Sequence, residues 1–179
     1  EALGFEVKLI PAQYVKAFLR GNKNDYNDAL AIADAVERAE MRFVAIKTVE
    51  QQDIQALHRL RKGCVGERTS LCNQTRSLAA EYGLVIPKGI ATLRRQIPLW
   101  LEDGENGLSD LFRRLLRESY ARLEDLDAHI AFYTKEIERQ SQQDDACQRL
   151  QTIPGYGPIL SSAFYSVVGN GKGYCQGRG

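Results

Sequence analysis

The sequence predicts a mostly α-helical protein, and three patterns carry that prediction. Residues 51–83 contain no proline, and apolar residues recur there every seven positions. Residues 108–140 carry apolar residues at spacings of three and four. Near the start of the chain, an alternating stretch at residues 5–10 precedes a helix-like segment at residues 24–38. Spacings of three and four are typical of one face of an α-helix, whereas alternation is typical of a strand.

The composition is that of an ordinary globular protein. The 179 residues are 44% hydrophobic and 26% charged, and the net charge of +1 creates no global field that would attract nucleic acid. The four cysteines form no CxxC pair, which disfavours a zinc site and favours free thiols in a reducing cytosol. No stretch approaches the ~20 apolar residues that a membrane-spanning helix requires, and no signal peptide is recognisable. We therefore expect a cytoplasmic protein without a membrane partner.

The first 48 residues are expected to contain a strand and one or two helices. Residues 5–10 (FEVKLI) alternate and end at Pro11, which predicts a strand. Residues 12–20 could form a short helix, residues 24–38 form a longer one, and residues 42–47 are extended. The apolar face expected on the longer helix consists of Ala29, Leu30, Ile32, Ala33 and Val36.

A first long helix is predicted over residues 51–83. A sustained sevenfold repeat argues for a supercoiled helix, although Gly63 and Gly66 each cost about 1 kcal/mol relative to alanine in a helix interior. Gly83 is placed to end the helix as its C-cap, with Pro87 beyond. The repeat consists of Leu57, Cys64, Leu71, Leu78 and Val85, widened by Val65, Cys72 and Ala79.

A second long helix is predicted over residues 108–140. Two helices of about 30 residues, each ~45 Å long, most simply pack as an antiparallel coiled-coil hairpin. A plain helical hairpin inside a bundle is the alternative. The apolar stripe of this second helix consists of Phe112, Leu116, Tyr120, Leu123, Leu126, Ile130, Tyr133 and Ile137.

Asp25 and Asp28 are candidate metal ligands. On a helix, positions three apart share a face, so both carboxylates can approach one point. Two carboxylates on one face suit a Mg²⁺ site for phosphodiester chemistry, because hard cations take oxygen ligands. The alternative is a pair of helix-start charges behind an N-cap at Asn24, favoured by the helix dipole. Spacing alone leaves both interpretations open.

Residues 153–159 (IPGYGPI) form a predicted turn between two helices, the second of which begins at about Pro158. The turn is similar to the hairpin of helix-hairpin-helix modules. In such a hairpin, glycines such as Gly155 and Gly157 let the backbone approach a phosphate, and the next helix start offers free N–H groups. An ordinary helix–helix turn is the alternative, and Tyr156 could contact nucleic acid or simply pack.

Basic residues of the first long helix could follow a phosphate backbone, or they could line a solvated helix face. Ser161 and Ser162 are interpreted as helix-surface residues, and His58 and His129 as packing or surface residues. The basic residues are Arg59, Arg61, Lys62, Arg68 and Arg76.

In combination, these segments resemble one family of proteins. The run NKNDYNDALAIADAV is followed by FVAIKTVEQQDIQALHRLRKGCVGERTSLCNQTRSLAAEYGLVIPKG, by a second long helix, and by LQTIPGYGPILSSAFYSVVGNGK. In this order they are similar to bacterial transposases of the insertion-sequence-110 family, DEDD type, and within it to the 1111 subgroup. The resemblance covers essentially the whole chain.

The resemblance implies a RuvC-like (ribonuclease H-like) domain, in which four acidic residues bind Mg²⁺ and the last two match Asp25 and Asp28. It implies a coiled-coil insertion used in homo-oligomer assembly, and a C-terminal transposase domain with a serine nucleophile. It also implies DNA and a structured guide RNA as partners, in the bacterial cytoplasm. The expected domains are residues 1–48, the end of the RuvC-like domain; 49–141, the coiled-coil hairpin; and 142–179, the start of the transposase domain.

The sequence departs from the family pattern because the first two acidic residues would precede Glu1 and the serine would follow Gly179. We therefore expect an internal fragment that is inactive alone, and neither Ser161 nor Ser162 takes the role of the serine. Two alternatives stay open: a non-catalytic coiled-coil adaptor that binds nucleic acid, and a RuvC-type junction nuclease.

Overall fold

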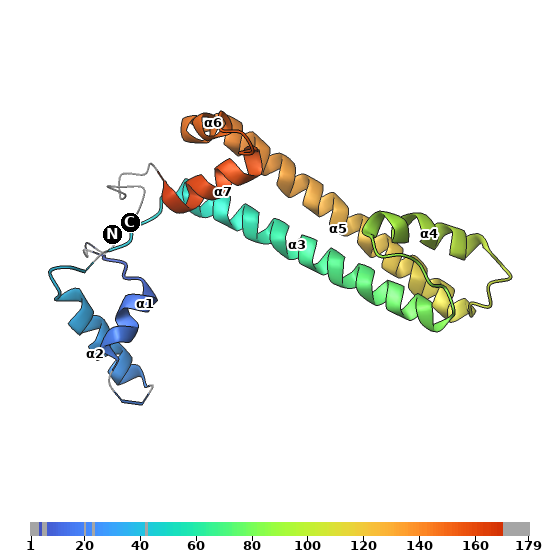
Figure 1. Ribbon diagram of the computed structural model, residues 1–179, viewed down its shortest axis with the longest axis horizontal. Helices are drawn as coiled ribbons and strands as arrows, with labels where there is room; N and C mark the ends of the chain where they lie inside the picture. Colours follow the sequence, from blue (N-terminus) through green and yellow to red (C-terminus); the bar gives the residue numbers. More distant parts are fainter. Residues whose placement is uncertain (1–3, 5–6, 20, 23, 42, 170–179) are drawn as a thin grey trace. The chain divides into compact units, whose positions relative to one another are not determined.

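The computed structural model describes residues 4, 7–19, 21–22, 24–41 and 43–169. The chain divides into two compact units between Thr48 and Val49, and each unit is described by itself. All the regular elements in the described part are helices (Figure 1), which confirms the prediction of a mostly α-helical protein.

The first unit is built from a short helix α1 (Ala12–Val15), a 3-10 turn η1 (Lys16–Phe18) and the helix α2 (Asp25–Val36). The start of α2 is fixed by Asn24, whose side chain accepts a hydrogen bond of 2.7 Å from the Asn27 backbone N–H. That bond satisfies one of the free donors of the first turn. The predicted helix is therefore confirmed, and α2 packs against α1 and η1.

The predicted strand at residues 5–10 is not formed in its described part. Residues 5 and 6 lie outside the described residues, and residues 7–10 form only an isolated antiparallel bridge between Leu9 and Val44. The Val44 N–H donates to the Leu9 carbonyl at 2.8 Å. Alternation describes a stretch that can pair, but a strand also needs a partner along several residues, and here the pairing stops at one bridge.

The apolar face predicted for α2 is also wrong. Its buried residues are Ala31 and Ala35, whereas Leu30, Ile32 and Val36 are exposed. Only the small elements α1 and η1 pack on α2 in this unit, and the side that meets them carries alanines. The larger apolar side chains consequently have no cover within the described unit.

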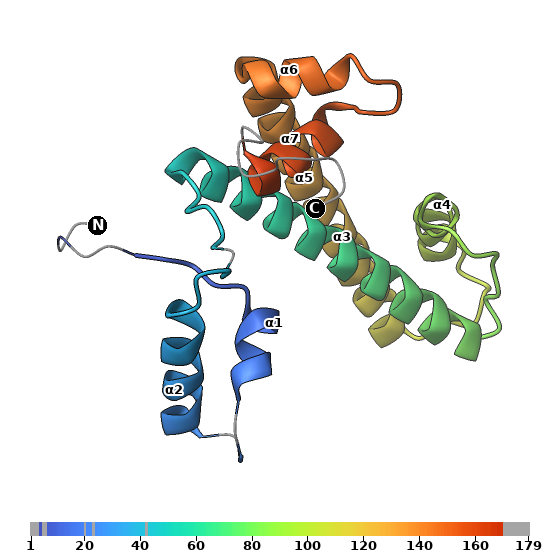
Figure 2. The same ribbon diagram turned by 60° about the vertical axis from the view of Figure 1, so that its left-hand side comes forward.

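The second unit is dominated by α3 (Val49–Glu81) and α5 (Asp110–Gln143). Both views show the two long helices side by side and antiparallel (Figures 1 and 2). Their register is marked by two polar contacts: the Arg61 Nε donates to Thr134 Oγ1 at 2.8 Å, and the Arg68 guanidinium pairs with Asp127 at 2.7 Å. The helical hairpin is thus formed, and its supercoiling stays a prediction.

The stripe predicted for α5 is confirmed, because six of its members are buried and Tyr120 and Tyr133 are half-buried. The sevenfold stripe of α3 is correct only in part. Leu71 is buried, but Leu78 is 41% exposed and Val85 lies beyond the helix. A straight helix drifts by ~20° per heptad relative to a repeat of seven, so the later positions turn away from α5. The buried members of the α5 stripe are Phe112, Leu116, Leu123, Leu126, Ile130 and Ile137.

The end of α3 follows the predicted C-cap. Gly83 has a φ of 79°, its N–H donates to the Ala80 carbonyl, and the Leu84 N–H donates to the Ala79 carbonyl. This pair of bonds is the Schellman motif, and glycine suits it because the left-handed backbone carries no Cβ penalty.

A helix that the sequence did not predict, α4 (Ile90–Glu102), lies along the end of the hairpin where α3 stops and α5 begins (Figure 1). Leu93, Ile97 and Trp100 of α4 join the main hydrophobic core of the unit. Arg113 of α5 holds the end of α4: its guanidinium donates to the carbonyls of Trp100, Leu101 and Asp103 and to Asn106 Oδ1.

Two further helices, α6 (Asp145–Gln151) and α7 (Pro158–Val168), follow α5. Pro158 occupies the first turn of α7, as predicted, since its fixed φ suits a helix start and no N–H is lost there. α7 packs against α3, α5 and α6, at the opposite end of the hairpin from α4 (Figure 2).

Candidate functional site

The two candidate carboxylates, Asp25 and Asp28, lie in the first turn of α2. The loop that precedes them is tied to the helix by two asparagines: Asn24 caps the helix, and Asn27 Nδ2 donates to the Asn22 carbonyl at 2.8 Å. The Asp28 N–H donates to the Asn24 carbonyl at 3.0 Å, which closes the first helical turn. The backbone that carries both carboxylates is therefore well fixed by local bonds.

The two carboxylates could supply part of the ligand set of a metal ion. Asp25 is exposed and Asp28 is half-buried, and positions three apart lie on one face of the helix. The N-terminal end of the α2 dipole favours their negative charge. Within the described residues, no group of three or more His, Cys, Asp or Glu side chains could hold an ion. The pair can supply two oxygen ligands for a hard cation such as Mg²⁺, and a complete site needs others.

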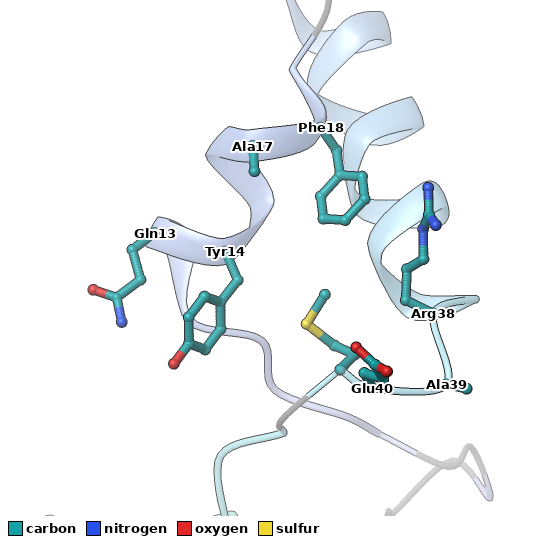
Figure 3. Close-up of a pocket in the computed structure, with 8 residues that line it drawn as sticks. Gln13, Tyr14, Ala17, Phe18, Arg38, Ala39 and Glu40 are labelled. Atoms are coloured by element: carbon teal, nitrogen blue, oxygen red, sulfur yellow. The ribbon is translucent and has the colours of Figure 1, made fainter. Parts of the chain in front are cut away.

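An open cavity of about 730 Å³ lies in the same unit, but away from the aspartates. Figure 3 shows Tyr14 and Phe18 on one side of it and Arg38, Ala39 and Glu40 on the other. The Arg38 guanidinium lies 5.5 Å from the centre of the Phe18 ring, a cation–π contact. Because its lining includes residues that follow α2 and neither aspartate, the cavity is separate from the candidate carboxylates.

The turn between α6 and α7 places its glycines in the open. Gly155 has a φ of 87°, and no atom lies within 4 Å of a Cβ built on Gly155 or on Gly157. The Tyr156 N–H donates to the Ile153 carbonyl at 3.0 Å, and the Tyr156 ring meets Phe164 edge-on. Tyr156 therefore has the packing contact that the sequence left open, and the backbone beside it is free for close approach.

The five basic residues of α3 that were candidates for nucleic-acid binding differ in what they contact. Arg61 and Arg68 contact α5, and Arg94 of α4 adds a second guanidinium on Asp127. The Arg76 guanidinium donates to the Asn73 amide oxygen on its own helix. Arg59 and Lys62 are exposed. Arg61 and Arg68 thus have a role in helix packing, and nucleic-acid binding by any of the five stays a prediction.

Ser161 and Ser162 are fully buried, so their interpretation as helix-surface residues is wrong. Ser162 Oγ donates to the Pro158 carbonyl one turn back at 2.8 Å and lies 3.0 Å from His58 Nε2. Hydroxyls that bond to their own helix can be buried at little cost. Since Ser162 is inaccessible, the His58 contact is a packing contact between α3 and α7.

Two glutamines of α3, which were not predicted to have a role, also hold α7 against α3. Gln51 Nε2 donates to the Tyr165 carbonyl at 3.3 Å, and Gln55 Nε2 to the Ser166 carbonyl at 2.9 Å. The Gln51, Gln55 and His58 side chains follow a spacing of four and three on one face of α3, and that is the only sequence signal for them. Burial, with a smaller effect from the Arg61 charge, lowers the pKa of His58 below its ordinary 6.5.

None of the described helices is both long enough and apolar enough to cross a membrane.

Comparison with known proteins agrees with the residues that suggested the family. The family model of DEDD transposases of the insertion-sequence-110 type, described as Transposase, matches residues 1–83, which include both aspartates. No solved structure matches the chain.

Three relatives are similar over nearly the whole chain. The transposase for insertion sequence element IS1111A of Coxiella burnetii is 42% identical over 94% of this chain and 46% of its own length. The transposase for IS1328 of Yersinia enterocolitica is 38% identical, and a probable family 20 transposase of Pseudomonas aeruginosa is 37% identical, each over 98% of this chain and 52% of its own length. The chain spans about half the length of these curated relatives, and in these comparisons it is similar to the DEDD transposases of the insertion-sequence-110 family.

Proposed function

We propose that this chain contributes part of the catalytic centre of an insertion-sequence transposase that cuts and rejoins DNA, with Asp25 and Asp28 as two of its Mg²⁺ ligands. The observation that carries the proposal is their position: both lie in the capped first turn of α2, inside the segment that the DEDD transposase model matches. The remaining acidic ligands would come from residues outside the described part of this chain.

The residues of this chain hold and orient the carboxylates. Asn24 and Asn27 fix the loop and the first turn, so that Asp25 and Asp28 leave the helix at one end and on one face. When Mg²⁺ is bound, it supplies positive charge that stabilises the scissile phosphate. The N-terminal end of the helix dipole favours negative charge at these positions, which suits a cation site.

The proposed nucleic-acid contacts lie in the second unit. The open backbone at Gly155 and Gly157 supports close approach of a phosphate to the α7 start, with Tyr156 beside it. Arg59 and Lys62 support backbone contacts because they are exposed. A serine nucleophile other than Ser161 and Ser162, a structured guide RNA, and a homo-oligomer held by the α3–α5 hairpin complete the proposal.

The test uses the intact transposase with its element DNA and flanking non-coding RNA. Asp25→Asn and Asp28→Asn should each abolish Mg²⁺-dependent recombination. Each change replaces a charged carboxylate ligand with a neutral amide of nearly the same size. The matched control is Asp34→Asn, a half-buried aspartate farther along α2, which should retain recombination. Circular dichroism checks that all three variants keep their helix content.

If recombination survives both Asp25→Asn and Asp28→Asn, the metal assignment is wrong. The 179-residue chain alone should show no Mg²⁺-dependent cleavage, because two carboxylates do not complete the site. The second candidate, a nucleic-acid-binding adaptor, is favoured by the hairpin, which has its own core. DNA binding by the intact protein without any strand cleavage would support the adaptor over the transposase.

A further inference from the structure

The cavity of the first unit has an aromatic wall. Tyr14 and Phe18 are four residues apart on the stretch formed by α1 and η1, with Ala17 between them, and all three line the cavity. At this helical spacing the three side chains share one face, and Figure 3 shows the two rings beside the same space. Tyr14 is 40% exposed and Phe18 is half-buried, so both rings have flat surface left for a ligand.

The opposite wall is a turn that carries two opposite charges. The Met41 N–H donates to the Arg38 carbonyl at 3.1 Å, which closes a four-residue turn after α2. Figure 3 shows Arg38 and Glu40, both exposed, across the cavity from Tyr14. The Arg38 guanidinium lies 5.5 Å from the centre of the Phe18 ring. That cation–π contact uses the charge of the guanidinium, so its N–H groups stay available to a ligand.

Two rings, one cation and one anion together select a neutral, flat and polar ligand. Arg38 disfavours a cationic ligand, and Glu40 disfavours a simple anion. A nucleobase is planar and uncharged, and its edges carry donors for a carboxylate and acceptors for a guanidinium. The cavity volume of about 730 Å³ lies within the range of small-molecule sites and has room for a base.

We propose that this cavity binds an unpaired nucleobase, and that guanine fits it best. The base would stack on Tyr14. Guanine has adjacent donors at N1 and N2 for the two oxygens of Glu40, and acceptors at O6 and N7 for Arg38. Thymine has a single N–H donor and no amino group, so it satisfies the carboxylate less well. Pairing occupies the donor edge of a base, so the ligand must be unpaired.

The cavity and the candidate metal ligands lie at opposite ends of α2, whose 12 residues span about 18 Å. Asp28 shares a helix face with Ala31 and Ala35, the residues that α2 buries. At the ~3.4 Å per nucleotide of a duplex strand, 18 Å corresponds to about five nucleotides. A strand cut at the carboxylates could thus place an unpaired base in the cavity. The inference rests on the proposed function in taking nucleic acid as the partner.

The test compares bases at one position of a strand. Binding of 15-nucleotide oligo(dT) with a central dG, dA, dC or dT to the 179-residue chain is measured by fluorescence anisotropy in EDTA. The dG strand should bind about tenfold more tightly than the dT strand. Deoxyinosine, which lacks the amino group, and 7-deaza-deoxyguanosine, which lacks N7, should each lose about threefold relative to dG. Competition with guanosine monophosphate shows whether a free nucleotide binds as well as a base in a strand.

The carboxylate is tested by Glu40→Gln, which should weaken binding of the dG strand about fivefold and reduce the difference between dG and deoxyinosine. Removing a negative charge favours the nonspecific binding of an anionic strand, so weaker binding identifies Glu40 as a base contact. The matched control is Glu37→Gln, an exposed carboxylate outside the cavity lining, which should keep the preference for dG.

The ring is tested by two replacements of Tyr14. Tyr14→Phe keeps the flat face and should bind the dG strand like the parent, whereas Tyr14→Leu should weaken binding about tenfold. Phe43→Leu, which changes a 41% exposed ring outside the cavity lining, is the control and should bind like the parent.

Equal binding of the four strands by the parent would overturn the inference, as would unchanged binding of dG in Tyr14→Leu and Glu40→Gln. A preference for dG that the 179-residue chain has and the intact transposase lacks would also overturn it, because the cavity would then be covered in the whole protein. The Asp25→Asn/Asp28→Asn double variant should keep the preference for dG. Loss of recombination in that variant with the preference retained separates the metal proposal from this one.

Discussion

The helices α2 and α5 are both amphipathic in sequence, yet the side chains that they bury differ in size. α5 places large apolar side chains such as Leu116, Leu123 and Ile137 against α3. α2 buries only Ala31 and Ala35 and leaves Leu30 and Ile32 exposed. The hairpin therefore holds its core within its own unit, whereas the unit that carries the candidate carboxylates covers little of its own apolar surface.

This difference indicates that most of the stabilising core and the candidate metal ligands lie in separate units of this chain. Most apolar burial, and so most of the hydrophobic stabilisation, belongs to residues 49–170. Asp25 and Asp28 lie in the other unit. Substitutions in the hairpin should change the free energy of unfolding, and substitutions at the start of α2 should leave it nearly unchanged.

The largest effect is expected in the core of α5. Leu123→Ala should lower the free energy of unfolding by about 2–5 kcal/mol, because Leu123 is 1% exposed and its loss leaves a cavity. Chemical denaturation followed by circular dichroism measures it. Leu115→Ala on the same helix and Leu30→Ala on α2 are the matched controls, 52% and 44% exposed, and each should stay within about 0.5 kcal/mol. An equal cost for Leu30→Ala would show that α2 has a core of its own.

A smaller effect is expected at the end of α4. Arg113→Ala should cost about 1–3 kcal/mol, since the guanidinium supplies donors to four backbone carbonyls and to Asn106. Trp100 lies beside this contact, so its fluorescence should shift to the red as water reaches it. Arg114→Ala, at the exposed neighbouring position, should leave both readings unchanged. An unshifted Trp100 in Arg113→Ala would mean that the core alone holds α4.

The cap of α2 gives the corresponding test in the first unit. Asn24→Ala should cost about 1 kcal/mol locally and raise amide exchange in the first turn of α2 about fivefold, because the Asn27 N–H loses its acceptor. Amides in the middle of α5 should exchange as before. Asn24→Asp keeps an acceptor and should restore slow exchange. If α5 responds as well, the two units are energetically coupled and do not unfold independently.

The smallest effect concerns pH and the docking of α7. The folded-state pKa of His58 is below its ordinary 6.5, so the unfolded chain takes up a proton first as the pH falls. The free energy of unfolding should therefore decrease as the pH falls from about 7, through the ordinary pKa of 6.5, toward the lower folded-state pKa of His58. His58→Gln, which can still reach Ser162, should flatten the decrease between pH 7.5 and 5. An unchanged slope would assign it to other groups.

The parts of the fold that follow from periodicity could be predicted. The α5 stripe from Phe112 to Ile137 matched because one face of a long helix meets one partner along its length. The start of α2 and the end of α3 matched because Asn24 and Gly83 have the local chemistry of helix caps. These signals are local, so the sequence contains them in full.

The remaining features depend on packing that periodicity does not encode. The helix α4 was missed because Pro98 lies inside it and glycines flank it, although its core residues Leu93 and Ile97 are four apart. The burial of Ser161 and Ser162 depends on α3 lying against α7, which no local pattern shows. For the candidate site, the sequence placed Asp25 and Asp28 in one helical turn, but it could not show that Arg61 and Arg68 are used in packing.

The two polar contacts between α3 and α5 fix the register of the two helices and relate it to the length of the hairpin. From Arg61 to Arg68 the chain advances seven residues, and from Thr134 to Asp127 it goes back seven, so the two contacts lie two helical turns apart on both helices. The 33 residues of α3 then fix a span of about 50 Å between the end that carries α4 and the end where α7 docks. Adding seven residues to each helix would lengthen that span by about 10 Å and keep both contacts in step, whereas adding one residue to one helix would break them. The α3–α5 hairpin can consequently change length between related chains in steps of two helical turns, while the structures at its two ends stay the same.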